Sequence, residues 1–227
     1  SGSNAQESHF VIVKDEEPVL ERCLSSIAPY VEEIIIVDTG STDRTKEIAK
    51  SFGAKIYDFQ WIDDFATARN FAFSKATLEY VMWLDADDIV LEEHGQRLRE
   101  LKQYLEPHYN TVTMPYYLAT DISGQPTVVL RRNRLVKRSC NFKWIGAVHE
   151  YLEVYGPTYH SDVCVTHSKQ KSYTDRNLRI YRARQAKGEH FSPRDLFYFA
   201  NELFDHQYFE EARDYYNRFL GTGLGWV

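Results

Sequence analysis

An apolar run over residues 80–84 ends abruptly in the acidic sequence Asp-Ala-Asp-Asp at 85–88. The aromatic and branched residues of the run are typical of a strand buried on both faces, and such strands belong to parallel sheets covered by helices. In open α/β sheets ligands bind outside the carboxyl ends of the strands, so the acids stand where a divalent cation and a phosphorylated ligand would bind. Taken alone, an Asp-x-Asp sequence is more often an acidic turn, so features elsewhere in the sequence are needed to distinguish a binding site from a turn.

Alternating strand and helix patterns precede this run. The expected strands cover residues 9–14, 33–38 and 55–59, and the expected helices cover 19–27, about 42–52 and 65–72. Gly53 follows the second helix and is expected to end it in the left-handed conformation. Alternation of this kind predicts a parallel, doubly wound sheet.

Polar residues follow each of the expected parallel strands. They are Lys14 and Asp15, Asp38, Asp63 and Asp64 in the loop after the third strand, and Asp85 with Asp87. Because the carboxyl ends of parallel strands meet at one edge of a sheet, these residues are expected to converge there. This convergence is the strongest physical argument for a cation and phosphate site.

Beyond a helix expected over 92–105, the pattern changes. Strand-like segments at 111–118, 127–131 and 134–137 are separated by polar turns, which predicts antiparallel additions and a mixed sheet. Trp144, His149 and Glu150 then crowd into one short segment, and a strand over 162–166 ends at His167. A single histidine is more often structural than a ligand, but the position of these two after the acidic edge favours a site.

The remainder of the chain is expected to be helical, over 175–187, 193–204 and 208–220. The last two helices have facing apolar stripes and resemble one tetratricopeptide repeat, a unit that normally needs neighbours. We therefore expect an α/β domain over 6–170 and a tetratricopeptide-like segment over 171–227 that continues further in the natural protein. Residues 1–5 have the look of an expression-tag remnant.

Composition sets limits on partners and location. The 227 residues include 43% hydrophobic and 15% aromatic residues, which fits a globular protein large enough for an enzyme. A net charge of -6 argues against general nucleic-acid binding, although a basic cluster at 131–138 suits an anionic ligand or a solvated loop. No apolar run approaches the roughly 20 residues that span a bilayer. The three cysteines show no zinc or disulfide spacing, so a cytoplasmic protein is expected.

Five segments in order carry a resemblance to a known family: VKDEEPVLERCLSSI, IIIVDTGSTDRT, WIDDFATARNFA, WLDADD and WIGAVHEYL. They resemble a family 2 glycosyltransferase of the GT-A fold, of the bacterial kind often followed by tetratricopeptide repeats. The resemblance covers about residues 9–167. It implies a nucleotide-diphosphate sugar donor, with a uridine diphosphate sugar expected first, a Mn²⁺ or Mg²⁺ ion, and inversion at the sugar carbon by direct displacement.

The resemblance also implies roles for single residues. Asp87 is expected to bind the metal, while Asp85 contacts the ribose or a metal-bound water and His167 is a third metal-facing group. Glu150 is expected to be the general base that accepts the acceptor's proton, with His149 orienting it or contacting the sugar. The expected donor-binding residues are Val13, Lys14, Asp38, Asp64, Arg69, Asp85 and Trp144. Trp144 is as well explained by core packing, and Asp88 stands where many relatives have Glu.

Two other functions stay open on the sequence. An apolar strand followed by Asp-x-Asp superficially matches the nucleophile motif of haloacid-dehalogenase-like phosphatases, although that motif usually opens its domain. A second alternative is a non-catalytic scaffold that binds a protein through the helical repeats. The acceptor, whether peptide, glycan or lipid, is not indicated by the sequence.

Overall fold

The computed structural model describes residues 4–168 and 174–223. These residues form two compact units. The first holds the described residues within Ser1–Ile62, Thr67–Trp144 and Leu152–Gln170, and the second holds those within Asp63–Ala66, Ile145–Tyr151 and Lys171–Val227. The short segments 63–66 and 145–151 therefore belong with the helical part of the chain.

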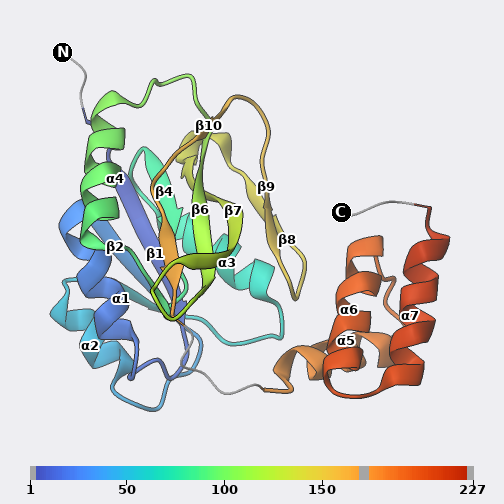
Figure 1. Ribbon diagram of the computed structural model, residues 1–227. Coiled ribbons are helices and arrows are strands. Elements are labelled where there is room, and N and C mark those ends of the chain that lie inside the picture. The colour runs from blue at the N-terminus through green and yellow to red at the C-terminus, as the bar shows by residue number, and fades with distance from the viewer. Residues whose placement is uncertain (1–3, 169–173, 224–227) are drawn as a thin grey trace. The chain divides into compact units, whose positions relative to one another are not determined.

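The first unit is built on a mixed sheet of nine strands (Figure 1). The strands are β1 (Glu7–Val13), β2 (Glu33–Asp38), β3 (Lys55–Asp58), β4 (Tyr80–Trp83), β5 (Asp88–Ile89), β6 (Thr111–Thr120), β7 (Pro126–Lys137), β10 (Thr158–His160) and β11 (Val165–His167). Their order is β3-β2-β1-β4-β7-β6-β11-β5, with β10 paired to β6. The strands β3, β2, β1 and β4 are parallel, and β7 is antiparallel to β4 and β6. The predicted doubly wound sheet with antiparallel additions is confirmed.

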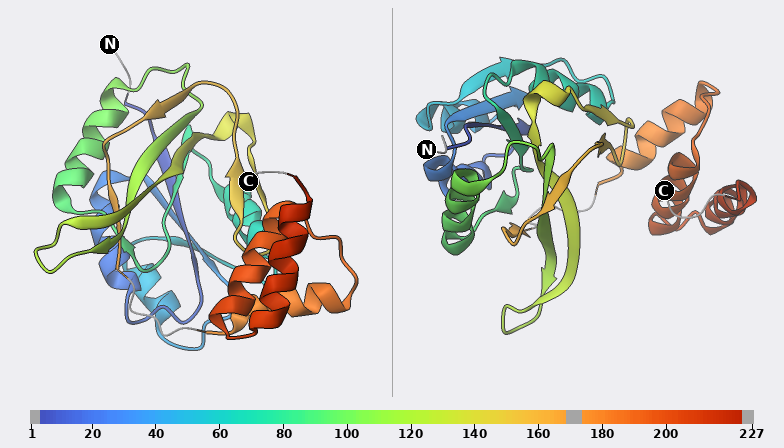
Figure 2. Two further views of the ribbon diagram at one scale, coloured as in Figure 1. Left: turned by 45° about the vertical axis from the view of Figure 1, so that its right-hand side comes forward. Right: turned by 90° about the horizontal axis from the view of Figure 1, so that it is seen from above.

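Helices cover both faces of this sheet (Figures 1 and 2). On one face lie α1 (Leu20–Ile27), α2 (Thr45–Ser51) and α4 (Glu92–Tyr104), whose apolar side chains share a core with alternate residues of β1 and β4. On the other face lies α3 (Phe65–Lys75), where the ring of Phe73 meets that of Phe10 at 5.3 Å between centroids. Short 3-10 helices η1 (Ala28–Tyr30) and η2 (Arg138–Cys140), and a two-stranded sheet of β8 (Lys143–Ile145) and β9 (Tyr151–Glu153), complete the connections.

The register of the parallel strands sets which residues lie at the carboxyl edge. Val13 pairs with Asp38 across β1 and β2, and Phe10 pairs with Trp83 across β1 and β4. The acids after β4 therefore follow a central strand. Gly53 has φ of 70°, the left-handed conformation that the sequence predicted for the end of α2.

Two predictions about the strands are wrong. The strand expected over 162–166 begins only at Val165 and runs to His167 as β11. Segments 127–131 and 134–137 were expected to be separate strands, but β7 is continuous, because the polar residues Arg132 and Asn133 pair with β6 instead of turning. The register shifts beside them, since Val112 pairs with Leu135 and Thr113 with Asn133. Arg134 is thus the extra residue of a β-bulge, and bulges re-aim side chains. Its guanidinium is fully buried.

The buried carboxylate of Glu33 ties β2 to its neighbours and predicts an acid-sensitive fold. It accepts hydrogen bonds from Ser8 Oγ at 2.6 Å, from Lys55 Nζ at 2.6 Å and from Thr77 Oγ1 at 2.8 Å. Burial alone would raise its pKa, but these bonds lower the pKa of Glu33 to about 2. A depressed carboxyl pKa stabilises the fold above the unfolded value and loses that stabilisation as pH falls, here between pH values of about 4.5 and 2.

We expect Glu33→Gln to lower the free energy of unfolding by about 3 kcal/mol at pH 7, with the difference falling to about half by pH 3. Urea denaturation of both proteins at the two pH values measures it. A difference that stays constant with pH would contradict the role of the Glu33 charge. Glu47→Gln, which changes an exposed carboxylate, is the control.

The second unit is helical. Its helices are α5 (Arg176–Ala186), α6 (Pro193–Asp205) and α7 (Phe209–Gly221). Ser192 and Asp195 form a capping box at the start of α6, and Pro193 occupies the first turn. Figure 2 shows α6 and α7 side by side, as the predicted hairpin requires, with rings of Phe199 and Tyr215 4.5 Å apart between them. Among the described residues, no helix is both long enough and apolar enough to cross a membrane.

Candidate active site

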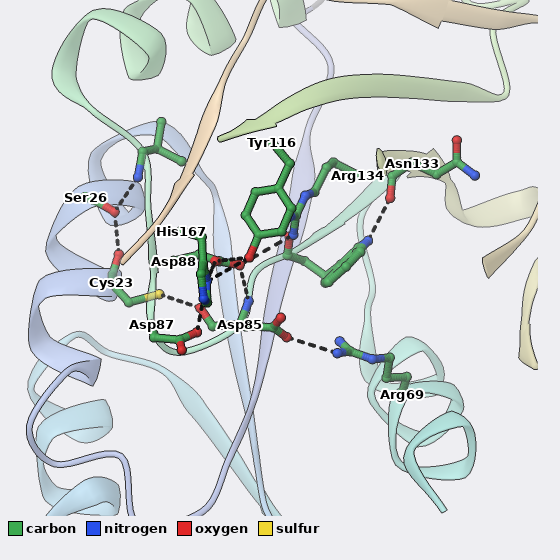
Figure 3. Close-up of polar contacts among 12 residues, drawn as sticks. Cys23, Ser26, Arg69, Asp85, Asp87, Asp88, Tyr116, Asn133, Arg134 and His167 are labelled. Carbon is green, nitrogen blue, oxygen red and sulfur yellow. Dashed lines mark hydrogen bonds and ion pairs between the residues drawn. The ribbon is translucent and has the colours of Figure 1, made fainter. Parts of the chain in front are cut away.

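A tight turn follows β4 and presents the acidic residues (Figure 3). The backbone N–H of Asp88 donates to Asp85 O at 3.0 Å, and the backbone N–H of Asp85 donates to Asp88 Oδ2 at 2.9 Å. Asp88 thereby closes the turn with both its backbone and its side chain. The carboxylates of Asp85 and Asp87 are left at the surface of the turn, with 45% and 16% of their side chains exposed.

Strand pairing brings His167 to this turn. The short strand β5 begins at Asp88 and pairs antiparallel with β11, so that His167 lies opposite Asp88. Its Nδ1 is 3.2 Å from Asp88 Oδ1 and 3.8 Å from Asp87 Oδ1. Ligand atoms of Asp87, Asp88 and His167 all lie within 4.8 Å of one another. Two carboxylates and an imidazole are a donor set that suits a divalent cation such as Mn²⁺.

Asp88 is the buried centre of a network that the sequence did not predict. Its carboxylate accepts a hydrogen bond from the Tyr116 hydroxyl, and Arg134 Nη1 lies 3.7 Å from its Oδ2. The Arg134 guanidinium stacks between the rings of Trp83 and Tyr116, at 4.2 and 4.4 Å from their centroids. Asp88 and Arg134 are both fully buried. In this arrangement Asp88 holds His167 and the turn, and Asp87 is the more exposed of the two acids beside His167.

The Asp88→Asn variant is expected to lose about 3 kcal/mol or more of unfolding free energy, because removing one partner leaves the buried Arg134 charge uncompensated. Urea denaturation measures the loss. Asp162→Asn, which alters an acid with an 83% exposed side chain 3.5 Å from Arg97, is the matched control and is expected to change stability by less than about 1 kcal/mol. Equal, small losses in both variants would show that the Asp88 charge does not matter.

Arg69 and Asp85 face one another at the open side of the turn. Arg69 Nη2 donates to Asp85 Oδ1 at 3.0 Å, and the Arg69 guanidinium lies 4.7 Å from the ring centroids of both Trp83 and Trp144. Trp144 is buried, and its backbone is fixed by Asn70, whose Oδ1 accepts from Trp144 N at 2.9 Å. Trp144 therefore packs in the core and orients Arg69. A contact between Trp144 and a donor sugar stays a prediction.

The charges of the site influence one another. Burial alone would raise the pKa of Asp85, but the guanidinium groups of Arg69 and Arg134 outweigh it and hold that pKa below its ordinary value. The pKa of Asp87 is raised, first by burial and then by the charges of Asp85 and Asp88. The hydrogen bond to Asp88 raises the pKa of His167. Carboxylates crowded in this way repel one another, and a bound cation would relieve that repulsion.

At the end of β2, the two carboxylate oxygens of Asp38 have different environments. Its Oδ1 accepts from the backbone N–H groups of Gly40 and Ser41 at 2.9 and 2.8 Å. Its Oδ2 is buried and has no hydrogen-bond partner among the described residues. Val13 O, at the end of β1, accepts from Thr39 N at 3.0 Å, while Lys14 is exposed. A ligand N–H group would satisfy the vacant oxygen of Asp38.

The predicted catalytic residues lie in the second unit. His149 and Glu150 are half-buried in the segment 145–151, and Asp64 is half-buried in 63–66. His149 Nε2 is 3.2 Å from Glu202 Oε1 of α6. The structure thus brings together Asp85, Asp87, His167 and Arg69 in the first unit, and it supplies His149 with partners in the second. The individual roles of these residues stay predictions.

Comparison with known proteins gives the family context. The sequence model described as glycosyl transferase family 2 matches residues 8–147. A TPR repeat-containing protein of Synechococcus elongatus is 46% identical over 149 residues, covering 66% of this chain and 36% of that protein. The SPbeta prophage-derived glycosyltransferase SunS of Bacillus subtilis is 28% identical over 226 residues, covering 93% of this chain and 52% of SunS. The chain thus spans about a third to a half of the length of these relatives.

Solved structures share the fold. Glucosyl-3-phosphoglycerate synthase from Mycobacterium tuberculosis, in complex with Mn²⁺ and UDP-glucose, superposes with a TM-score of 0.56 at 15% identity, covering 83% of this chain and 81% of that one. S. aureus TarS 1-349, in complex with UDP-GlcNAc, gives 0.54 at 15% identity, covering 88% and 73%. At this identity the likeness concerns the fold alone. The predicted GT-A fold with a helical C-terminal region is confirmed.

Proposed function

Since the chain belongs to glycosyl transferase family 2, we propose that it transfers a sugar from a nucleotide-diphosphate sugar to an acceptor, with inversion at the sugar carbon and with the help of a divalent cation. The observation that carries the proposal is the gathering of Asp85, Asp87, His167 and Arg69 after the central strand β4. This is the edge of an open α/β sheet at which ligands bind. The guanidinium of Arg69 suits the negative diphosphate of such a ligand, and the carboxylates of Asp85 and Asp87 suit the metal ion that accompanies it.

The base of the nucleotide is proposed to bind beside Asp38. The buried Oδ2 of Asp38 needs a donor, and a uracil N–H would provide one. Val13 and Lys14, at the end of the neighbouring strand, are proposed to line the same pocket. The UDP-sugar complexes of the two structural neighbours support uridine as the first choice.

The sugar diphosphate is proposed to bind at the acidic turn. Asp87 and His167 would hold Mn²⁺ or Mg²⁺, which would neutralise the charge that develops on the diphosphate leaving group. Arg69 would donate to a phosphate oxygen, and Asp85 would accept from the ribose hydroxyls or from a metal-bound water. Asp64 is proposed as a further donor contact.

The displacement of the diphosphate by the acceptor needs a general base. We propose that Glu150 accepts the proton of the acceptor's nucleophilic group as the nucleophilic atom attacks the sugar carbon, while the bond to the diphosphate breaks on the opposite side. His149 would orient Glu150 or contact the sugar. The acceptor is a peptide, glycan or lipid, and the tetratricopeptide-like segment 171–227 is proposed to offer a surface for a protein partner.

Calorimetric titration tests the donor site. The chain is titrated with UDP, GDP, ADP and dTDP, each with Mn²⁺ and with a chelator. We expect binding of UDP in Mn²⁺ that disappears in the chelator, and mass spectrometry of products formed from a panel of UDP-sugars then identifies the sugar. Flat titrations for every nucleotide in Mn²⁺ would refute the proposed function.

A further inference from the structure

The segment that carries His149 and Glu150 has an unusual backbone. Gly146 has φ of 104°, and His149 has φ of 53°. A left-handed conformation is easy for glycine but costs free energy for histidine, and it persists only where the surroundings enforce it. Such strain occurs often at functional sites.

Helix α6 supplies a ring stack, a polar side-chain contact and a backbone hydrogen bond to His149. The imidazole of His149 stacks on the ring of Tyr198, with centroids 4.2 Å apart and planes at 13°. Its Nε2 lies 3.2 Å from Glu202 Oε1, one helical turn further along α6. Arg194 Nε donates to the backbone carbonyl of His149 at 3.2 Å, and its guanidinium lies 4.8 Å from the Tyr198 ring centroid. Helix α6 thus contacts both the ring and the backbone of His149, and the His149 ring also stacks with Tyr181 of α5 at 6.4 Å between centroids.

Glu202 is arranged to act as a charged partner. It is 9% exposed, and its Oε1 also lies 3.3 Å from Asn177 Nδ2 of α5. Burial would raise its pKa, but the hydrogen bonds from His149 and Asn177 keep the pKa of Glu202 below its ordinary value. A carboxylate that accepts from an imidazole fixes the ring's orientation, as in other histidine sites. At the other end of the turn, Ala147 O accepts from Phe65 N at 2.9 Å.

We propose that the helical segment has a task besides partner binding: Glu202 and Tyr198 are positioning residues that hold the His149–Glu150 turn in the conformation required for sugar transfer. The inference rests on the function proposed above, since it takes Glu150 as the base. It also explains why α6 contacts the His149–Glu150 turn through a carboxylate and a tyrosine. A helical repeat that only packs against neighbouring repeats would be expected to have apolar residues there.

Kinetics of the chain provide the first test. Release of UDP from UDP-glucose and UDP-GlcNAc in Mn²⁺, with water taking the sugar, is measured for Glu202→Gln, Tyr198→Ala and Tyr198→Phe. We expect the first two to lower kcat about tenfold with little change in KM, because a misplaced catalytic group slows the chemical step without weakening donor binding. Tyr198→Phe keeps the ring stack and is expected to stay near wild type. Glu211→Gln, which neutralises a carboxylate paired with Arg182 in the same unit, is the matched control.

Hydrogen–deuterium exchange of the amides of 146–151 provides the second test, because it does not depend on activity. Faster exchange is expected in Glu202→Gln and Tyr198→Ala and not in Glu211→Gln. Unchanged exchange in both variants would overturn the inference, and so would a normal kcat in a variant whose turn exchanges faster. A wild-type rate of UDP release by Glu150→Gln would instead refute the proposal that Glu150 is the general base, and this outcome is distinct from the two above.

Discussion

The Asp87→Asn variant is expected to lose about 100-fold or more in Mn²⁺-dependent affinity for UDP, since altering even the groups that orient metal ligands costs 10–100-fold in metal affinity. Asp87 is the partly exposed acid beside His167, whereas Asp85 is more exposed but pairs with Arg69, and Asp88 is buried. The amide keeps the size of the side chain but removes its charge. Calorimetry with UDP at several Mn²⁺ concentrations measures the loss.

A second strand-end acid serves as the control for this experiment. Asp58 ends β3 at the same edge of the sheet, is 74% exposed and pairs with Lys46. Asp58→Asn is expected to bind UDP like the wild type. If Asp87→Asn also binds normally in Mn²⁺, the metal is held by other residues or plays no part in donor binding.

The Glu150→Gln variant is expected to lower the rate of sugar transfer about 1,000-fold and leave donor affinity unchanged, because a glutamine cannot accept the proton that a general base takes. Release of UDP from UDP-glucose and UDP-GlcNAc, with water taking the sugar, measures the rate, and calorimetry measures the affinity. The two readouts separate catalysis from binding.

Glu153→Gln is the matched control, because Glu153 is an exposed acid of β9 three residues further along the chain. It is expected to keep the wild-type rate. Weakened donor binding in Glu150→Gln, rather than a slower reaction, would make Glu150 a structural residue of the turn.

Much of the first unit could be predicted because its signals are local. The segment 33–38 is β2 as expected, and all six of its residues are buried, which is why it contains an uninterrupted apolar run.

The parallel order of the strands also weakens the phosphatase alternative. The Asp-x-Asp turn follows a central strand with three parallel strands on one side of it, whereas a phosphatase nucleophile motif would open its domain.

The network around Asp88 could not be predicted, because it depends on distant residues and on an irregular strand. Tyr116 reaches Asp88 across 28 positions of sequence, and Arg134 arrives only because β7 contains a bulge. The two residues of β5 are too few to show the alternation of buried and exposed side chains by which a strand is recognised in a sequence. For the same reason the sequence indicated His149 as a site residue but could not reveal its partner Glu202, which lies 53 positions away.

The bulge in β7 has a consequence for how this part of the chain can vary in length. Removing Arg132 or Asn133 from β7 would restore regular pairing with β6, but the side-chain alternation beyond that point would reverse. Arg134 would leave the interior, and Asp88 would keep its buried charge without the guanidinium. Insertions and deletions in this strand are therefore expected to be far more damaging than in the exposed hairpin turn at 121–125.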